Sequence, residues 1–326
     1  MKDKIYPVAV IGGGAAGTMA VLRTVLNNDE TLFFPGTTKD KKRSRALWVT
    51  KVENMPGHIK YTKGIEQPNK ESLDWLSESE FKNKFHWFRN VGITRIVKRD
   101  DGIFELTDSN SFQYLSRFVI VCTGVMDVQP IINGDIEEIF PYANLQLADY
   151  CLRCDGHHVL HKHSAVIGHD DGAAWVAIML FERYETPTMK ILTHGKKPEF
   201  SQDVQALIKK YNIEVISEEI KKIEGNPKEK VLTGFQFADG NKVKVEICFI
   251  SLGMIVYNDL PKMLGADLDK RGFVVTNAKG ESSVSGLYVA GDLRAGIKKQ
   301  IYTAWDSAVD SADDINYKLR VLKRNS

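Results

Sequence analysis

The strongest constraint on the fold of this chain is a glycine pattern that follows an apolar run near the N-terminus. Residues 8–11 read Val-Ala-Val-Ile, which is typical of a buried parallel strand. Three glycines follow in a G-x-G-x-x-G spacing, and apolar residues continue at helical spacing through Leu26. The first glycine allows a tight turn, the second lets the backbone approach a pyrophosphate, and the third lets helix and strand pack closely. The residues predicted to meet the phosphates at the start of this helix are Gly12, Gly14, Ala15, Ala16 and Gly17.

A second copy of this strand–turn–helix unit lies in the middle of the chain, where Gly168 corresponds to Gly12. In both halves the helix is followed by strand-like pieces that polar turns separate. Each series ends in an apolar strand, at 117–124 in the first half and at 246–253 in the second. Both halves therefore read as a β-α-β unit followed by an antiparallel meander.

The end of the chain breaks this symmetry. The segment "GLYVAGD" at 286–292 is a further apolar strand, and a helical pattern follows at 299–321. We expect these elements to return to the first domain and complete it. The sequence predicts an α/β fold with two Rossmann-like domains of the FAD/NAD(P)-binding, three-layer ββα type. The second domain, 126–250, is inserted into the first, which comprises 1–125 and 251–326.

Composition narrows the class of protein. The chain has 326 residues, enough for two domains, and a net charge of +2, which implies no strong attraction to nucleic acid or membrane. No apolar stretch reaches transmembrane length, and the N-terminus lacks a signal-peptide pattern. Four cysteines are too few for a secreted disulfide scaffold, and Cys122 and Cys248 lie in apolar strands, so we interpret them as core residues. We expect a cytoplasmic protein that binds neither nucleic acid nor membrane.

The other two cysteines, Cys151 and Cys154, form a C-x-x-C pair that two chemistries fit. A pair of this spacing at a helix start forms and breaks a disulfide readily. The alternative is a zinc site completed by the histidines that follow, which are His157, His158, His161 and His163. Zinc patterns leave about 12 residues between the two ligand pairs, whereas the first histidine here follows Cys154 directly after "DG". We therefore favour the redox disulfide, predict no metal, and interpret the histidines as surface or loop residues, two of them near enough to affect its proton supply.

Five motifs together resemble the low-molecular-weight thioredoxin reductase family of flavoproteins, in the family's order and over nearly the whole chain. They are "VENMPG" at 52–57, "CTG" at 122–124, "CLRCDG" at 151–156, "GLYVAGD" at 286–292 and "KQI" at 299–301. The resemblance implies FAD in the first domain, a redox disulfide in the second, a homodimer, and a thioredoxin-like protein disulfide as the partner.

The resemblance also assigns residues. Cys151 and Cys154 would be catalytic, with Asp155 beside them supplying or accepting a proton. Asp292 would bind the ribityl chain of FAD. The flavin-binding residues that the motifs add to the first glycine turn are Asn54, Thr123, Gly124, Gly291, Asp292, Lys299, Gln300 and Ile301.

The second glycine turn departs from the family. The NADPH-binding pattern G-G-G-x-x-A is replaced at 168–173 by Gly-His-Asp-Asp-Gly-Ala, and the usual His-Arg-Arg is replaced at 193–195 by Thr-His-Gly. A carboxylate at Asp170 repels a pyrophosphate, and the missing arginines remove the recognition of a 2′-phosphate. NADPH is therefore not the expected electron donor.

Several electron sources stay open at this point. One is a second FAD per chain, held by His169, Asp170, Asp171 and Trp305. Another is direct donation by ferredoxin or another external donor, and a third is conventional NADPH-driven thioredoxin reduction. An electron-transfer flavoprotein without a protein-disulfide client is the alternative function.

Overall fold

The computed structural model describes residues 4–42 and 44–325, and the chain divides into two compact units. Unit 1 consists of Met1–Leu47, Tyr61–Met126 and Val256–Ser326. Unit 2 consists of Trp48–Lys60 and Asp127–Ile255. The segment 48–60, which the sequence analysis placed in the first domain, thus clusters with the inserted unit.

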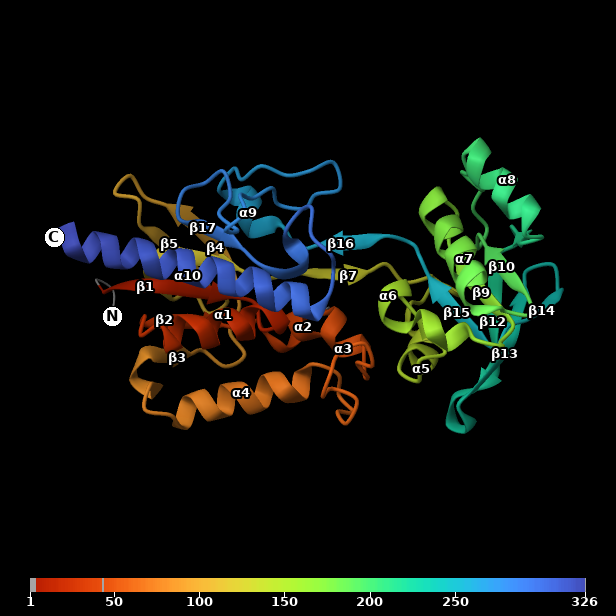
Figure 1. Cartoon of the computed structure of the whole chain (residues 1–326), viewed down its shortest axis with the longest axis horizontal. Coiled ribbons are helices and arrows are strands. Elements are labelled where there is room, and N and C mark those ends of the chain that lie inside the picture. Colours follow the sequence, from red (N-terminus) through yellow and green to blue (C-terminus); the bar gives the residue numbers. More distant parts are fainter. Residues whose placement is uncertain (1–3, 43, 326) are drawn as a thin grey trace. The chain divides into compact units, whose positions relative to one another are not determined.

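Unit 1 is built on a sheet of seven strands (Figure 1). They are β1 (Ile5–Ile11), β2 (Thr31–Phe34), β3 (Phe85–Trp87), β4 (Ile93–Lys98), β5 (Phe104–Asp108), β6 (Gln113–Val121) and β17 (Leu287–Val289). The order is β3-β2-β1-β6-β5-β4, with β17 parallel to β6 and the β4-β5-β6 meander antiparallel. Val8 and Val10 of β1 pack on one face and Ala9 and Ile11 on the other, all buried. Burial on both faces explains the continuous apolar run of this strand.

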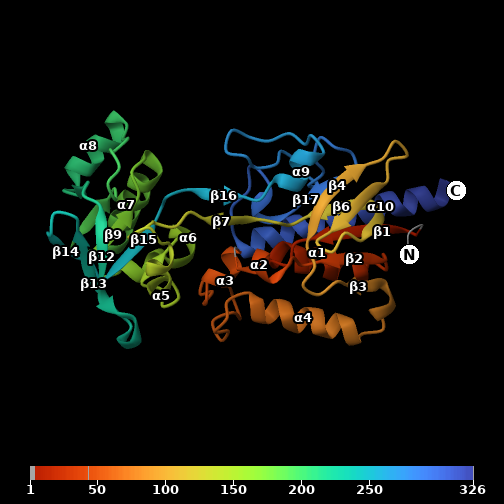
Figure 2. The ribbon, with the colours of Figure 1, turned by 180° about the vertical axis from the view of Figure 1, so that it is seen from behind.

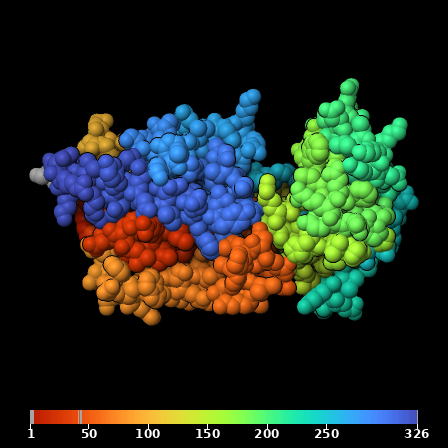
Figure 3. All heavy atoms as spheres, viewed as in Figure 1, coloured from red at the N-terminus to blue at the C-terminus, as the bar shows by residue number. Residues whose placement is uncertain are grey.

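The main helices over this sheet come from opposite ends of the chain. They are α1 (Ala15–Leu26), α4 (Glu66–Glu78) and α10 (Ile301–Asn325). The shorter helices are α2 (Thr38–Lys41), α3 (Arg45–Trp48), η1 (Lys82–Lys84), α9 (Asp259–Met263) and η5 (Gly291–Leu293). Helix α10 lies along α1, as the blue and red surfaces of Figure 3 show, and Arg23 Nε donates to Asp313 Oδ1 at 2.6 Å between them. The C-terminal helix therefore completes the first domain.

Unit 2, which Figure 2 shows from behind, repeats the arrangement. Its parallel sheet has the order β11-β10-β9-β15-β8. These strands are β8 (Ala148–Asp149), β9 (Ser164–Ile167), β10 (Met189–Leu192), β11 (Glu214–Ile216) and β15 (Ile247–Ile250). An antiparallel meander forms a separate sheet of β12 (Ile220–Asn226), β13 (Val231–Phe237) and β14 (Lys242–Lys244). The junctions with unit 1 run through a strand pair, β7 (Val125–Asp127) and β16 (Met254–Val256).

The helices of unit 2 include the one that follows its glycine turn, α7 (Asp171–Tyr184). The others are η2 (Glu137–Ile139), α5 (Phe140–Ala143), α6 (Leu152–Asp155), η3 (Gly156–Val159), α8 (Gln202–Lys210) and η4 (Pro227–Glu229). Both units thus place a helix after the first strand of a parallel sheet and add a meander. This confirms the predicted α/β class with two Rossmann-like domains, the second inserted into the first.

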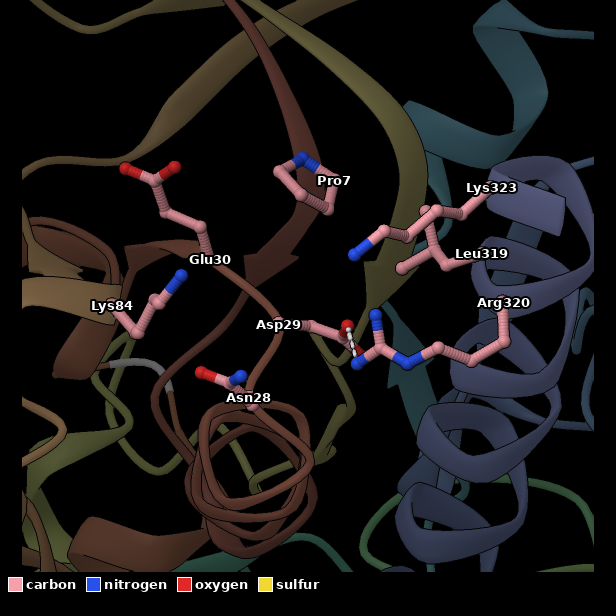
Figure 4. Close-up of a pocket in the computed structure, with 8 residues that line it drawn as sticks. All are labelled: Pro7, Asn28, Asp29, Glu30, Lys84, Leu319, Arg320 and Lys323. Carbon is pink, nitrogen blue, oxygen red and sulfur yellow. Dashed lines mark hydrogen bonds and ion pairs between the residues drawn. The ribbon is translucent and has the colours of Figure 1, made fainter. Parts of the chain in front are cut away.

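A hollow of about 290 Å³ lies in unit 1 at the end of β1 away from its glycine turn (Figure 4). Arg320 of α10 points across it and donates to Asp29 Oδ1 at 2.8 Å. Asn316 donates to the other oxygen of Asp29, also at 2.8 Å. These hydrogen bonds and the ion pair connect α10 to the loop that follows α1. Among the residues described, no helix combines the length and apolar character that a membrane crossing requires.

Candidate active site

The first glycine turn has the geometry of a phosphate-binding loop. A Cβ on Gly17 would lie 1.8 Å from the carbonyl oxygen of Gly12, so helix and strand meet only because this residue is glycine. Gly14 is the N-cap residue of α1 and makes no side-chain cap, and a Cβ there would meet no described atom within 4 Å. Among the described residues, the first N–H groups of α1 thus have neither a side-chain cap from Gly14 nor a carboxylate in the first turn of the helix.

Asp292 lies next to this turn because Gly291 brings the two segments together. Gly291 has φ +75°, its N–H donates to Ser307 Oγ at 3.0 Å, and a Cβ there would be 2.7 Å from Cβ of Ala16. Arg45 Nη1 is 3.6 Å from Asp292 Oδ2, and both side chains are mostly buried. The structure thus brings η5, which contains Asp292, next to the N-terminal part of α1.

The other predicted flavin-binding residues lie in several separate segments of the chain. Thr123 Oγ1 donates to the carbonyl of Tyr257 at 2.6 Å, and Gly124 has φ +66°. Gln300 is buried and directly precedes Ile301, the first residue of α10. The last member of this group, Asn54, lies in the 48–60 segment of unit 2.

Lys299, the first residue of the "KQI" motif, is partly buried. Its Nζ donates to the carbonyl of Arg294 at 2.6 Å and lies 4.0 Å from the ring centre of Phe273. Burial lowers the pKa of Lys299 to about 8, although Asp292 pulls in the opposite direction. The ammonium group is thus held less strongly protonated than a surface lysine.

Cys151 and Cys154 are joined in a disulfide at the start of α6, with their Cα atoms 5.3 Å apart. The N–H of Cys154 also points at Cys151 Sγ, at 3.2 Å. Asp155 follows the pair and is buried. Cys122 and Cys248 are free and buried, and burial raises the pKa of each thiol, so the core interpretation is confirmed.

The two histidines after the disulfide belong to a charged network. His158 Nδ1 is 2.8 Å from Asp149 Oδ2, and its Nε2 is 3.0 Å from Glu53 Oε2. His157 Nε2 is 2.9 Å from the same Glu53 oxygen. The side chain of His158 is only 14% exposed, so its interpretation as a surface or loop residue was wrong. Its neighbours are acidic, and the local sequence gave no sign that Glu53 and Asp149 would enclose it.

The protonation of His158 follows from these contacts. Burial by itself lowers the pKa of His158, but the hydrogen bond and charge of Asp149, with the hydrogen bond of Glu53, outweigh burial and raise the pKa to about 9. The hydrogen bonds from His158 and His157 in turn lower the pKa of Glu53. A carboxylate oxygen of Asp155 lies within 4.8 Å of a ring nitrogen of His158. A protonated imidazole therefore lies next to the acid that follows the disulfide.

The second glycine turn differs from the first in one respect that matters for ligands. Asp170 is the N-cap of α7, and its Oδ1 accepts a hydrogen bond from the N–H of Ala173 at 2.9 Å. Asp171 Oδ1 accepts from the N–H of Ser201 at 2.7 Å, and the N–H of Glu199 donates to the carbonyl of His169 at 2.7 Å. The chain's own carboxylate thus occupies one of the N–H donors that a phosphate uses in a turn of this type.

The segment that would recognise a 2′-phosphate has structural contacts instead. Thr193 is buried, and its hydroxyl donates to the carbonyl of Lys196 at 2.5 Å. His194 has φ +52°; its Nε2 donates to the carbonyl of Ile131 at 2.8 Å and its Nδ1 accepts from the N–H of Ile220 at 3.0 Å. Of the predicted second-site residues, Trp305 lies in α10 of unit 1 and the other three lie in unit 2.

With this geometry established, comparison with known proteins identifies the class. The chain belongs to the pyridine nucleotide-disulphide oxidoreductase family, whose model matches residues 6–312. It is similar to the thioredoxin reductase of Mycoplasmopsis pulmonis, at 25% identity over 312 residues, covering 93% of this chain and 94% of that one. It is also 26% identical to the thioredoxin reductase of Treponema pallidum over 307 residues, covering 92% of each.

A solved structure shows the same fold. The thioredoxin reductase of Streptococcus pyogenes superposes with a TM-score of 0.81 at 19% identity, covering 97% of this chain and 99% of that one. The predicted resemblance to the low-molecular-weight thioredoxin reductases is confirmed, and the chain is a flavin-linked disulfide oxidoreductase of that type.

The family implies FAD, and the residues of unit 1 fit it. The uncapped N-terminus of α1 and the open space over Gly14 suit a pyrophosphate, and Asp292 offers a carboxylate to hydroxyl groups.

Proposed function

We propose that the protein reduces a thioredoxin-like protein disulfide and takes its electrons from a donor other than NADPH. The observation that carries the second part is the contrast between the two glycine turns. The N-terminus of α1 has no side-chain cap, whereas Asp170 caps α7 in the corresponding position. A phosphate at α7 would have to displace a hydrogen-bonded carboxylate and approach its negative charge.

The chain's own residues have distinct roles in this proposal. Bound FAD would supply the electron pair that opens the disulfide. The N-terminus of α1 would hold the pyrophosphate and Asp292 the ribityl hydroxyls, with Lys299 and Gln300 at the start of α10. Asp155 would protonate the thiolate that leaves when the bond between Cys151 and Cys154 breaks. The resulting dithiol then attacks the partner disulfide through a mixed disulfide, and the second thiolate resolves it.

His158 supports the proton supply in this scheme. One of its ring nitrogens lies within 4.8 Å of a carboxylate oxygen of Asp155. Asp149 and Glu53 raise the pKa of His158 and so keep it protonated. A protonated imidazole beside Asp155 can restore the proton that Asp155 gives up. The client of this chain is inferred from its similarity to the two thioredoxin reductases named above.

The experiment compares electron donors for one holoprotein. Flavin absorbance is followed anaerobically after mixing with NADPH, NADH or reduced ferredoxin, and each donor is then tested for turnover of oxidised thioredoxin. We expect ferredoxin or another one-electron donor to bleach the flavin quickly and both nicotinamides to act slowly. Rapid bleaching by micromolar NADPH would refute the proposal about the donor and leave the reductase activity standing.

A second flavin at the α7 turn is the finer alternative, with electrons passing through it to the first. Asp170 and Asp171 each have a second carboxylate oxygen besides the one that accepts the backbone hydrogen bond, and these oxygens suit ribityl or ribose hydroxyls. Flavin analysis decides this point, because two FAD per chain favours the second site and one favours direct donation.

The remaining features stay predictions. We propose a homodimer and a cytoplasmic location. Sedimentation of the FAD-loaded protein tests the dimer.

A further inference from the structure

Two imidazole nitrogens and one carboxylate oxygen converge beside the disulfide in unit 2. Glu53 Oε2 is 2.9 Å from His157 Nε2 and 3.0 Å from His158 Nε2. The three atoms all lie within 4.8 Å of one another. Once their Nε2 protons are released, two imidazoles with a carboxylate form a donor set that zinc and other late first-row divalent ions take in proteins, so a bound ion would replace the proton that His158 carries at Nε2.

The orientation of His158 is a second, independent observation. Its other ring nitrogen, Nδ1, is 2.8 Å from Oδ2 of Asp149, which is 5% exposed. A histidine that ligates a metal through one nitrogen almost always donates the other N–H to a carboxylate or carbonyl, which fixes the tautomer and the ring direction. Asp149 therefore turns Nε2 of His158 toward Glu53 in the way that an outer carboxylate does in zinc sites.

The exposure of the three side chains gives the site a closed side and an open side. His158 and Glu53 are 14% and 24% exposed, whereas His157 is 50% exposed. Both histidines lie on η3, directly after α6, so the local backbone holds them together. An ion could enter from the side of His157 and complete its coordination with water, which is the arrangement of a three-ligand zinc site.

We propose that Glu53, His157 and His158 bind a divalent transition-metal ion, with zinc as the expected occupant. The cysteines are not part of this site, because both are committed to the disulfide. The sequence analysis predicted no metal, since it considered only ligand sets that included the cysteines. Asp149, Asp155 and His158 form a second close trio, but it has one imidazole and two buried carboxylates, and it shares His158 with the first.

The test measures zinc directly, with FAD bound and the disulfide oxidised. Tag-free holoprotein is freed of metal by chelator, titrated with Zn²⁺ against a chromophoric chelator, and analysed for retained metal after gel filtration. We expect one zinc per chain, with millimolar Mg²⁺ unable to displace it because imidazole favours zinc. Failure to retain zinc would overturn the proposal and would mean that the cluster is only a hydrogen-bonded network.

Variants assign the ligands. Glu53→Gln and His158→Gln each remove one ligand and should weaken zinc binding by at least ~100-fold, and Asp149→Asn should weaken it by about 10–100-fold. His161→Asn is the matched control, because His161 is exposed, lies outside the trio and has φ +59°, which asparagine tolerates. Wild-type affinity in Glu53→Gln and His158→Gln would overturn the assignment. The flavin spectrum reports folding, and because no turnover is measured, the result is independent of the proposed reductase function.

Discussion

Substitution of Asp170 should change stability and anion binding in opposite directions. The carboxylate caps α7 through one hydrogen bond of 2.9 Å to the N–H of Ala173. Replacing an N-cap aspartate by alanine costs typically ~1 kcal/mol, so Asp170→Ala should lower the free energy of unfolding of the protein by about that amount. The same change uncovers the first N–H groups of the helix and removes a negative charge.

The gain in NADPH affinity can be bounded in the same way. Two unit charges at ~4 Å and an effective dielectric constant of ~20 repel each other by about 4 kcal/mol, which is roughly three powers of ten in affinity. Asp170→Gly, which removes bulk and charge together, should therefore bind NADPH between ~10-fold and ~1000-fold more tightly than the wild type. Thr193 and Gly195 hold the gain below the upper bound, because neither side chain can bind a 2′-phosphate.

Two further variants distinguish the effect of helix capping on stability from the effect of the negative charge on NADPH affinity. Asparagine caps helices about as well as aspartate, so Asp170→Asn should keep the stability and still bind NADPH more tightly. Asp171→Asn is the matched control, because that carboxylate bonds the N–H of Ser201 instead of capping α7. Urea unfolding and calorimetric titration with NADPH give the two quantities. The reasoning fails if Asp170→Ala is as stable as the wild type, or if Asp170→Asn and Asp170→Gly bind NADPH no better.

The remaining predictions concern the disulfide, the first glycine turn and one buried acid. Cys151→Ser or Cys154→Ser should abolish reduction of a protein disulfide while FAD stays bound, which a turnover assay and the flavin spectrum check; full turnover in either variant would contradict the assignment. Gly14→Ala should fold normally, because the added Cβ meets no described atom, and it should bind FAD more weakly, because the Cβ fills the space where the pyrophosphate would lie. Gly17→Ala should fail to fold, because its Cβ would lie 1.8 Å from the carbonyl oxygen of Gly12. Equal FAD content in wild type and Gly14→Ala would be evidence against a pyrophosphate at this turn. Burial raises the pKa of Asp29 above its usual value, despite its contacts with Asn316 and Arg320. The folded state therefore binds this proton more readily than the unfolded state, so the stability of the wild type relative to Asp29→Asn should be greatest near pH 4 and fall as the pH rises. Urea unfolding of both proteins across pH 4–7 tests the sign.

The sequence was most informative where one backbone geometry permits one residue type. The glycine spacing at 12–17 predicted the turn before α1 because a Cβ on Gly17 would collide with the carbonyl of Gly12, and a Cβ on Gly12 would collide with the carbonyl of Cys122. The apolar runs likewise located β1, β6, β9 and β15, since central parallel strands are buried on both faces. The helical pattern at 299–321 corresponds to α10, which the structure places at Ile301–Asn325.

Contacts between distant segments could not be predicted in the same way. Glu53 lies far from His157 in sequence, and the motif at 52–57 drew attention to Asn54 instead. Asp170 was recognised as an obstacle to phosphate, but its role as a helix cap depends on the local backbone, with φ −110° and ψ 175° at that residue. The sequence identifies such a residue but does not show which N–H group its side chain accepts a hydrogen bond from.

The cap on α7 can also be regarded as an intramolecular inhibitor. A carboxylate tethered to the turn competes with any free anion at an effective concentration on the order of millimolar or higher, whatever the supply of ligand outside. The domain then gains from its own side chain the stabilisation that a bound nucleotide would otherwise provide. We therefore expect the domain to stay folded without a nucleotide, and substitution of Asp170 to weaken this internal competition.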